Sequence, residues 1–102
     1  MKFIFFGTPE FAAIILEKLI QAELMPEAVI CNPDKPTGRK QIITPPPVKV
    51  LAQKYGLTIY QPKDKNELLE IIKKLQPDLA IVAAFGMLFP KEILAVPKYG
   101  FI

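Results

Sequence analysis

The feature of this 102-residue sequence that most constrains its fold is the alternation of short apolar runs with segments of helical periodicity. The apolar runs occupy residues 2–6, 27–31, 57–60 and 79–84. The segments in which apolar residues recur at helical spacing are residues 11–21, 48–55 and 68–75. Short apolar runs are typical of strands covered on both faces, and such strands pair in parallel through right-handed helical crossovers. We therefore expect an α/β fold, a Rossmann-like open parallel sheet with flanking helices.

The first helix should begin just after Gly7, which breaks the first apolar run. Thr8 is a suitable N-cap residue, and Pro9 suits the first helical position. The helix should bury a broad apolar face, which we expect to consist of Phe11, Ile15, Leu16, Leu19 and Ile20.

The last residues, Phe101 and Ile102, resemble the start of a further strand. Because complete domains more often end in a polar, frayed segment, we expect residues 1–102 to be a fragment, or one part of a longer protein. The sheet should then be truncated, with an apolar edge and face left exposed.

Several site classes are disfavoured by composition. The chain has no histidine and one cysteine, Cys31, so it lacks Ser-His or Cys-His catalytic pairs, histidine metal sites and an internal disulfide. The glycine patterns of dinucleotide-binding and phosphate-binding loops are also missing. Since no apolar run reaches the roughly 18 residues that span a bilayer, and no signal peptide is evident, we expect a cytoplasmic protein without a membrane partner.

Residues 32–49 form a basic, proline-rich stretch, which we expect to be a long irregular loop. It contains no acidic residue after Asp34. Its cations are Lys35, Arg39, Lys40 and Lys49. Cations on a stiffened loop suit a phosphate backbone, although composition alone favours an ordinary solvated loop.

A second candidate site is the apolar turn that follows the last buried run. It comprises Gly86, Met87, Leu88 and Phe89. Such a turn can pack on the core, or it can provide an apolar wall and free backbone groups for a flat ring. The residues leave both readings open.

Three segments resemble methionyl-tRNA formyltransferases, and the likeness extends over nearly the whole chain. They read KFIFFGTPEFA, PDKPTGRKQIITPPPVKVLA and QPDLAIVAAFGMLFPKEIL, while the closing PKYGFI is similar to the approach to the family's catalytic N-x-H segment. That family transfers a formyl group from 10-formyltetrahydrofolate to the amino group of methionyl initiator tRNA. It has a Rossmann-like formyltransferase domain followed by a C-terminal barrel domain.

The resemblance assigns roles to both candidate sites. It implies that Arg39 and Lys40, and less directly Lys35 and Lys49, contact tRNA, because the family's basic loop inserts at the acceptor end. It implies that Gly86, Met87, Leu88 and Phe89 lie along the folate pterin. The family's catalytic Asn, His and Asp would follow Ile102, so we expect no catalytic residue, no metal site and no barrel domain in residues 1–102. The oligomeric state is left open.

Two other functions are compatible with the sequence. One is a folate-dependent formyltransferase that acts on a purine precursor or a sugar nucleotide, and the other is a non-catalytic module that binds folate or a nucleotide. Between the two enzymes, the basic loop favours tRNA as the substrate, and the binding module stays open.

The absence of the catalytic segment leads to a first prediction. Purified residues 1–102 should produce no formyl-methionyl-tRNA, because the donors that stabilise the oxyanion of acyl transfer would lie outside them. The assay compares product formation with a reaction that contains no enzyme. Product above that background would contradict the prediction.

Overall fold

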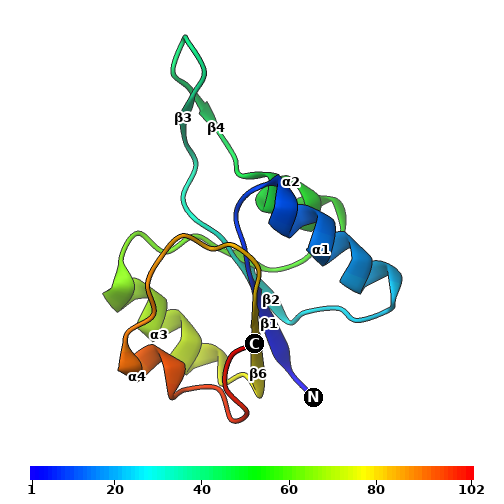
Figure 1. Cartoon of the computed structure of the whole chain (residues 1–102), viewed down its shortest axis with the longest axis vertical. Helices are drawn as coiled ribbons and strands as arrows, with labels where there is room; N and C mark the ends of the chain where they lie inside the picture. The colour runs from blue at the N-terminus through cyan, green and yellow to red at the C-terminus, as the bar shows by residue number, and fades with distance from the viewer.

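The computed structural model describes all of residues 1–102, and a four-stranded parallel sheet lies at its centre (Figure 1). β1 (Phe3–Phe6) pairs with β2 (Ala28–Ile30) on one side and with β6 (Leu79–Val82) on the other. β5 (Ile59–Tyr60) pairs with β2 and completes the order β5-β2-β1-β6. The expected open parallel sheet is confirmed.

Helices cover both faces of this sheet. α1 (Glu10–Gln21) and α2 (Pro47–Lys54) pack on the face that carries Phe5, whereas α3 (Lys65–Leu75) and α4 (Lys91–Leu94) pack on the opposite face. This separation follows from the period of two along a strand, which sends successive side chains of β1 to opposite faces. None of the helices combines the length and apolar character that a membrane crossing requires.

The chain beyond α4 returns to the sheet. Phe101 forms a parallel bridge with Ala80, as expected for the start of a further strand next to β6. Between β6 and the end of α1, an apolar groove of about 430 Å³ remains open, and its lining includes Phe3, Leu79 and Ile81. The expected exposed apolar face of the sheet is therefore present.

The first helix differs from the expectation in its start and in its buried face. α1 begins at Glu10 with Pro9 at the N-cap position, and no side chain caps it. Leu16 is buried as expected, and Ile15, Leu19 and Ile20 are partly buried against the core. Phe11, however, is 63% exposed, and Ala12 and Ala13 are buried in its place. The reason lies in close packing at Gly7, where an added Cβ would come within 2.6 Å of the Ala12 Cβ. Small side chains therefore face the sheet, and Phe11 points away from it.

The proline-rich stretch is not an irregular loop as expected. β3 (Lys35–Thr37) and β4 (Ile42–Thr44) form an antiparallel hairpin that projects from the body (Figure 1). A tight turn closes it, with the φ of Gly38 at 73° and that of Gln41 at 52°. The hydroxyls of Thr37 and Thr44 share a hydrogen bond of 2.7 Å across the stem. Pro36 is tolerated because both strands are edge strands.

The close packing at Gly7 can be tested by substitution. Gly7→Ala should destabilise the protein by about 1–3 kcal/mol, because the added methyl group overlaps the Ala12 Cβ and the Phe5 ring. The free energy of unfolding is measured by urea denaturation. In the double variant with Ala12→Gly, the loss should be smaller than the sum of the two single losses, since the overlap with Ala12 is removed. Strict additivity would show that this contact does not determine the residue at position 7.

Candidate functional site

The carboxyl ends of the parallel strands all reach the same edge of the sheet. β1 leads into Gly7, β2 into Asn32, β5 into Gln61 and β6 into Phe85. In open α/β sheets this edge is where ligands bind, because the strands end there and the following loops diverge. Both candidate sites from the sequence lie at this edge: the hairpin follows β2, and the apolar turn follows β6.

The carbonyl oxygen of Phe85 joins these two segments. The side-chain amide of Asn32 donates to it at 2.7 Å, and the hydroxyl of Thr8 donates to it at 3.2 Å. The backbone N–H of Asn32 in turn donates to the Thr8 hydroxyl at 3.2 Å. Thr8 is therefore not the helix cap that we expected. It links the ends of β1, β2 and β6.

The apolar turn has an unusual backbone. Ala84 has a φ of 61° and Gly86 a φ of 94°, both in the left-handed region. A Cβ on Gly86 would lie 3.2 Å from the Asn32 amide nitrogen, so glycine is required by both conformation and contact. The backbone N–H and C=O groups of residues 86–89 make no hydrogen bond within the protein. These groups can therefore bind the polar edge of a ligand.

The side chains of this turn have different surroundings. Phe89 stacks on Phe85 with centroids 5.7 Å apart and contacts Phe6 edge to face, so it belongs to the aromatic core. Leu88 is 80% exposed. Met87 lines a shallow hollow of about 540 Å³ together with Asp64, Lys65 and Asn66 at the start of α3. The open apolar surface of the turn thus comes from Met87 and Leu88.

The base of the hairpin is held by a clamp around Asp34. Lys49 of α2 contacts both carboxylate oxygens at 3.1 Å, and the Gln61 amide donates to one of them at 2.7 Å. Gln61 also donates to the Asn32 carbonyl oxygen at 3.1 Å. The hydrogen bonds from Gln61 and Lys49 lower the pKa of Asp34 below its ordinary value of 3.8. The sequence placed Asn32 and Gln61 at the carboxyl ends of strands but indicated no role for them, since isolated amides carry no recognisable pattern.

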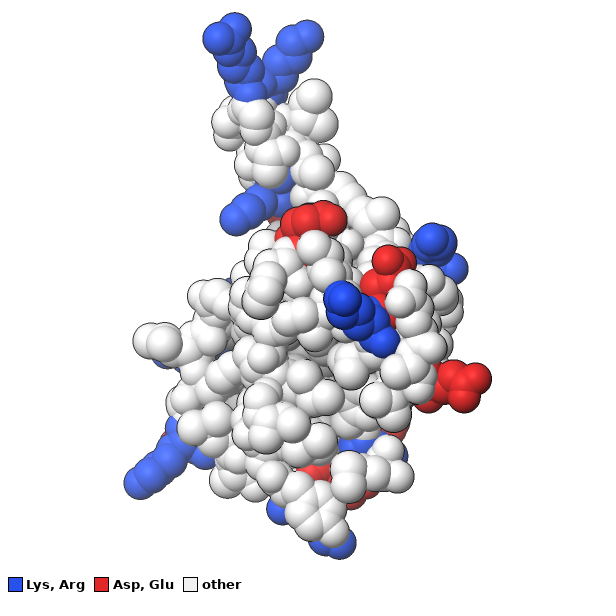
Figure 2. Space-filling view, turned by 45° about the vertical axis from the view of Figure 1, so that its right-hand side comes forward, with Lys and Arg blue, Asp and Glu red and all other residues white.

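The four cations predicted to contact tRNA occupy two different environments. Arg39 and Lys40 lie at the exposed tip of the hairpin, and Lys35 lies on its stem. None of these three forms an ion pair, and Figure 2 shows cationic side chains gathered at the projecting tip. Lys49 is separate from them, with its side chain 20% exposed and paired with Asp34. The structure therefore brings Arg39 and Lys40 together at the tip, while Lys35 lies on the same hairpin near its base.

Cys31 lies directly behind this edge and is fully buried. Burial raises the pKa of its thiol from 9.0 to about 11, with a smaller opposing effect from Lys49. The thiol is neutral near pH 7, and only the thiolate is an effective nucleophile. Cys31 therefore acts as a small core residue, as the sequence indicated. No group of three His, Cys, Asp or Glu side chains is arranged to hold a metal ion.

The Asp34 clamp should control the mobility of the hairpin in a pH-dependent way. Above about pH 4 the carboxylate is ionised and holds Lys49, and this contribution is lost as pH falls through the lowered pKa of the folded protein. Asp34→Asn should therefore reduce hydrogen-exchange protection of the hairpin amides near pH 7. The difference between the two proteins should vanish in acid. Equal protection at pH 7 would show that the clamp does not restrain the hairpin.

Comparisons with known proteins place this architecture in a family. A family model described as formyl transferase matches residues 1–102. The methionyl-tRNA formyltransferases of Caldicellulosiruptor saccharolyticus, Geotalea daltonii and Staphylococcus aureus are 50%, 49% and 50% identical to this chain. The alignments cover 99% or 100% of this chain and 34%, 33% and 33% of those proteins. The chain thus spans about a third of the length of these relatives.

The full-length family match agrees with the parallel sheet and with the two segments at its carboxyl edge. The chain belongs to the formyl transferase family.

Proposed function

We propose that residues 1–102 are the N-terminal part of a formyltransferase domain that modifies methionyl initiator tRNA. The formyl donor in this proposal is 10-formyltetrahydrofolate, and the acceptor is the α-amino group of the methionine. The catalytic segment and the barrel domain would belong to the remaining two thirds of the length found in the relatives. The observation that supports this proposal most strongly is that the hairpin, with its unpaired cations, lies at the same edge of the sheet as the open apolar turn at residues 86–89.

The hairpin supports the RNA part of this proposal. Arg39 and Lys40 have no acidic partner, so their charge is available to phosphates, and arginine can bind a phosphate through two donors. Ile42 and Ile43 next to them are 63% and 61% exposed. An isolated two-stranded hairpin with exposed apolar side chains is marginally stable in water, which favours a role in contacting a partner.

The turn at residues 86–89 supports the folate part. A pterin is a flat ring system with donors and acceptors along its edge. Met87 and Leu88 offer apolar surface, and the free backbone groups of residues 86–89 offer matching hydrogen bonds. The residues present therefore fit this co-substrate. Phe89 would support the turn from the core rather than touch the ring.

The hydrogen bonds at the Phe85 carbonyl oxygen link the base of the hairpin to the turn at residues 86–89. Acyl transfer requires the amine to reach the formyl carbon, and correct relative placement of two substrates can lower a barrier by several kcal/mol. The hydrogen bonds from Asn32 and Thr8 hold the hairpin base and the turn at fixed separation. In this proposal the chain therefore orients donor and acceptor, while the oxyanion and the proton are handled by residues outside it.

The alternative formyl acceptors account less well for the hairpin. A purine precursor or a sugar nucleotide is small and needs no cationic arm that projects from the body. A non-catalytic binding module would also leave the exposed tip without a role. The names of the relatives, all methionyl-tRNA formyltransferases, support the tRNA substrate.

Arg39 provides the direct test. In the intact gene product, Arg39→Ala should weaken binding of initiator tRNA. It should also reduce the magnitude of the slope of log K against log salt concentration by about 1, because the variant makes one phosphate contact fewer and so releases fewer counterions on binding. Affinities are measured by fluorescence titration over a series of salt concentrations.

A matched control is Lys18→Ala, which removes an exposed cation from the last turn of α1. α1 runs antiparallel to the strands, so Lys18 lies toward the opposite edge of the sheet, and its removal should leave the slope unchanged. Equal slopes for the Arg39 variant and the unmodified protein would exclude the hairpin from tRNA binding.

A further inference from the structure

A cavity of about 370 Å³ lies at the base of the hairpin. It is enclosed by the hairpin stem, by the turn between β1 and α1, and by the prolines that lead into α2. Five prolines, three threonines, Glu10 and Lys35 form its lining.

The proline walls determine what kind of surface a ligand would meet. Proline rings are apolar, hold a fixed φ and carry no N–H, so these walls are preformed and donate no backbone hydrogen bond. Two of the threonine hydroxyls, on Thr37 and Thr44, bond to each other, and the third, on Thr8, is engaged at Phe85. The walls therefore suit the apolar faces of a flat ring.

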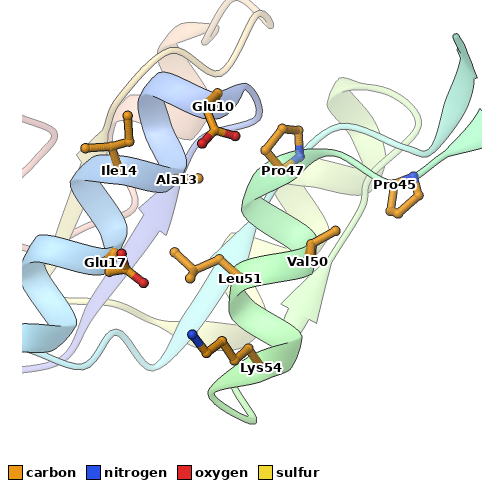
Figure 3. Close-up of a pocket in the computed structure, with 9 residues that line it drawn as sticks. All are labelled: Glu10, Ala13, Ile14, Glu17, Pro45, Pro47, Val50, Leu51 and Lys54. Carbon is orange, nitrogen blue, oxygen red and sulfur yellow. The ribbon is translucent and has the colours of Figure 1, made fainter. Parts of the chain in front are cut away.

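Two charged side chains supply the polar chemistry. Glu10 and Lys35 form no ion pair with each other or with any other residue. Glu10 lies in the first turn of α1, on the side facing Pro47 (Figure 3). It also lines a wider groove of about 490 Å³ between α1 and α2, so it stands where the two cavities meet. A free carboxylate repels a phosphate placed against it and accepts hydrogen bonds. The ligand should therefore present a hydrogen-bond donor to Glu10 and any phosphate to Lys35.

We propose that this cavity holds one unpaired nucleotide of an RNA, with a base that carries an exocyclic amino group. The base would lie between the proline rings, its amino group would donate to Glu10, and its phosphate would contact Lys35. Carboxylates accept from such amino groups, and single-stranded RNA is read through bases splayed out of the stack. This inference rests on the proposed RNA-binding function of the hairpin and adds base recognition to it.

Glu10→Gln separates base recognition from general charge effects. The probes are RNA stem-loops with a short 3′ overhang of uridines, in which each uridine is replaced in turn by cytidine or by adenosine, whose bases carry an exocyclic amino group. The unmodified intact gene product should prefer one such replacement by about fivefold or more. Glu10→Gln should reduce that preference, because the neutral amide accepts more weakly and its NH2 group can donate to uridine. It should also tighten binding of the all-uridine probe, because a negative charge near RNA is removed.

Glu17→Gln is the matched control, since Glu17 is on the same helix and lines only the wider groove. It should leave the preference for the amino-bearing base intact. A lack of preference in the unmodified protein, or a preference that is undiminished in Glu10→Gln, would overturn the base pocket. Either result is distinguishable from failure of the proposed function, which would appear as an unchanged salt slope in the Arg39 variant.

Discussion

The two hydrogen bonds that converge on the Phe85 carbonyl oxygen connect the functional parts of this chain. They tie the end of β6 to the end of β2 through Asn32 and to the end of β1 through Thr8. This arrangement is possible only because the strands are parallel, which brings their carboxyl ends to one edge. The hairpin and the apolar turn, far apart in sequence, thereby become neighbours in a common site.

The same edge combines a packed element and a projecting one. The packed part is the aromatic cluster of Phe6, Phe85 and Phe89, which holds the turn against the core. The projecting part is the hairpin, whose strands pair only with each other and whose tip is exposed. The Asp34 clamp lies at the base of the hairpin, where it joins the body. This division agrees with the proposed function, in which the turn holds a small co-substrate and the hairpin contacts a large RNA.

Local sequence patterns predicted the sheet and the helices because burial on both faces leaves a short apolar run that is visible without tertiary information. The hairpin escaped prediction because each of its strands has only three residues and both are mostly exposed, so no apolar alternation marks them. β3 also contains Pro36, and the β-branched residues of β4 stand within a proline-rich stretch that is typical of a loop. The exposure of Phe11 also depends on the close approach of α1 at Gly7. The residue types of Arg39 and Lys40 alone favoured an ordinary solvated loop, and it was the family resemblance that nominated them for tRNA. The pairing of Lys49 with Asp34 requires the placement of α2 against β2, which no local pattern reveals.

The central claim is that RNA approaches the edge of the sheet from which the hairpin projects. Site-specific photocrosslinking tests it most directly, with a photoreactive side chain at Ile42 or at Leu24 in the intact gene product. Both positions are well exposed, at 63% and 52%, but Leu24 follows α1 at the opposite edge. The account predicts crosslinks to initiator tRNA from position 42 and none from position 24. Crosslinks from position 24 alone would contradict it.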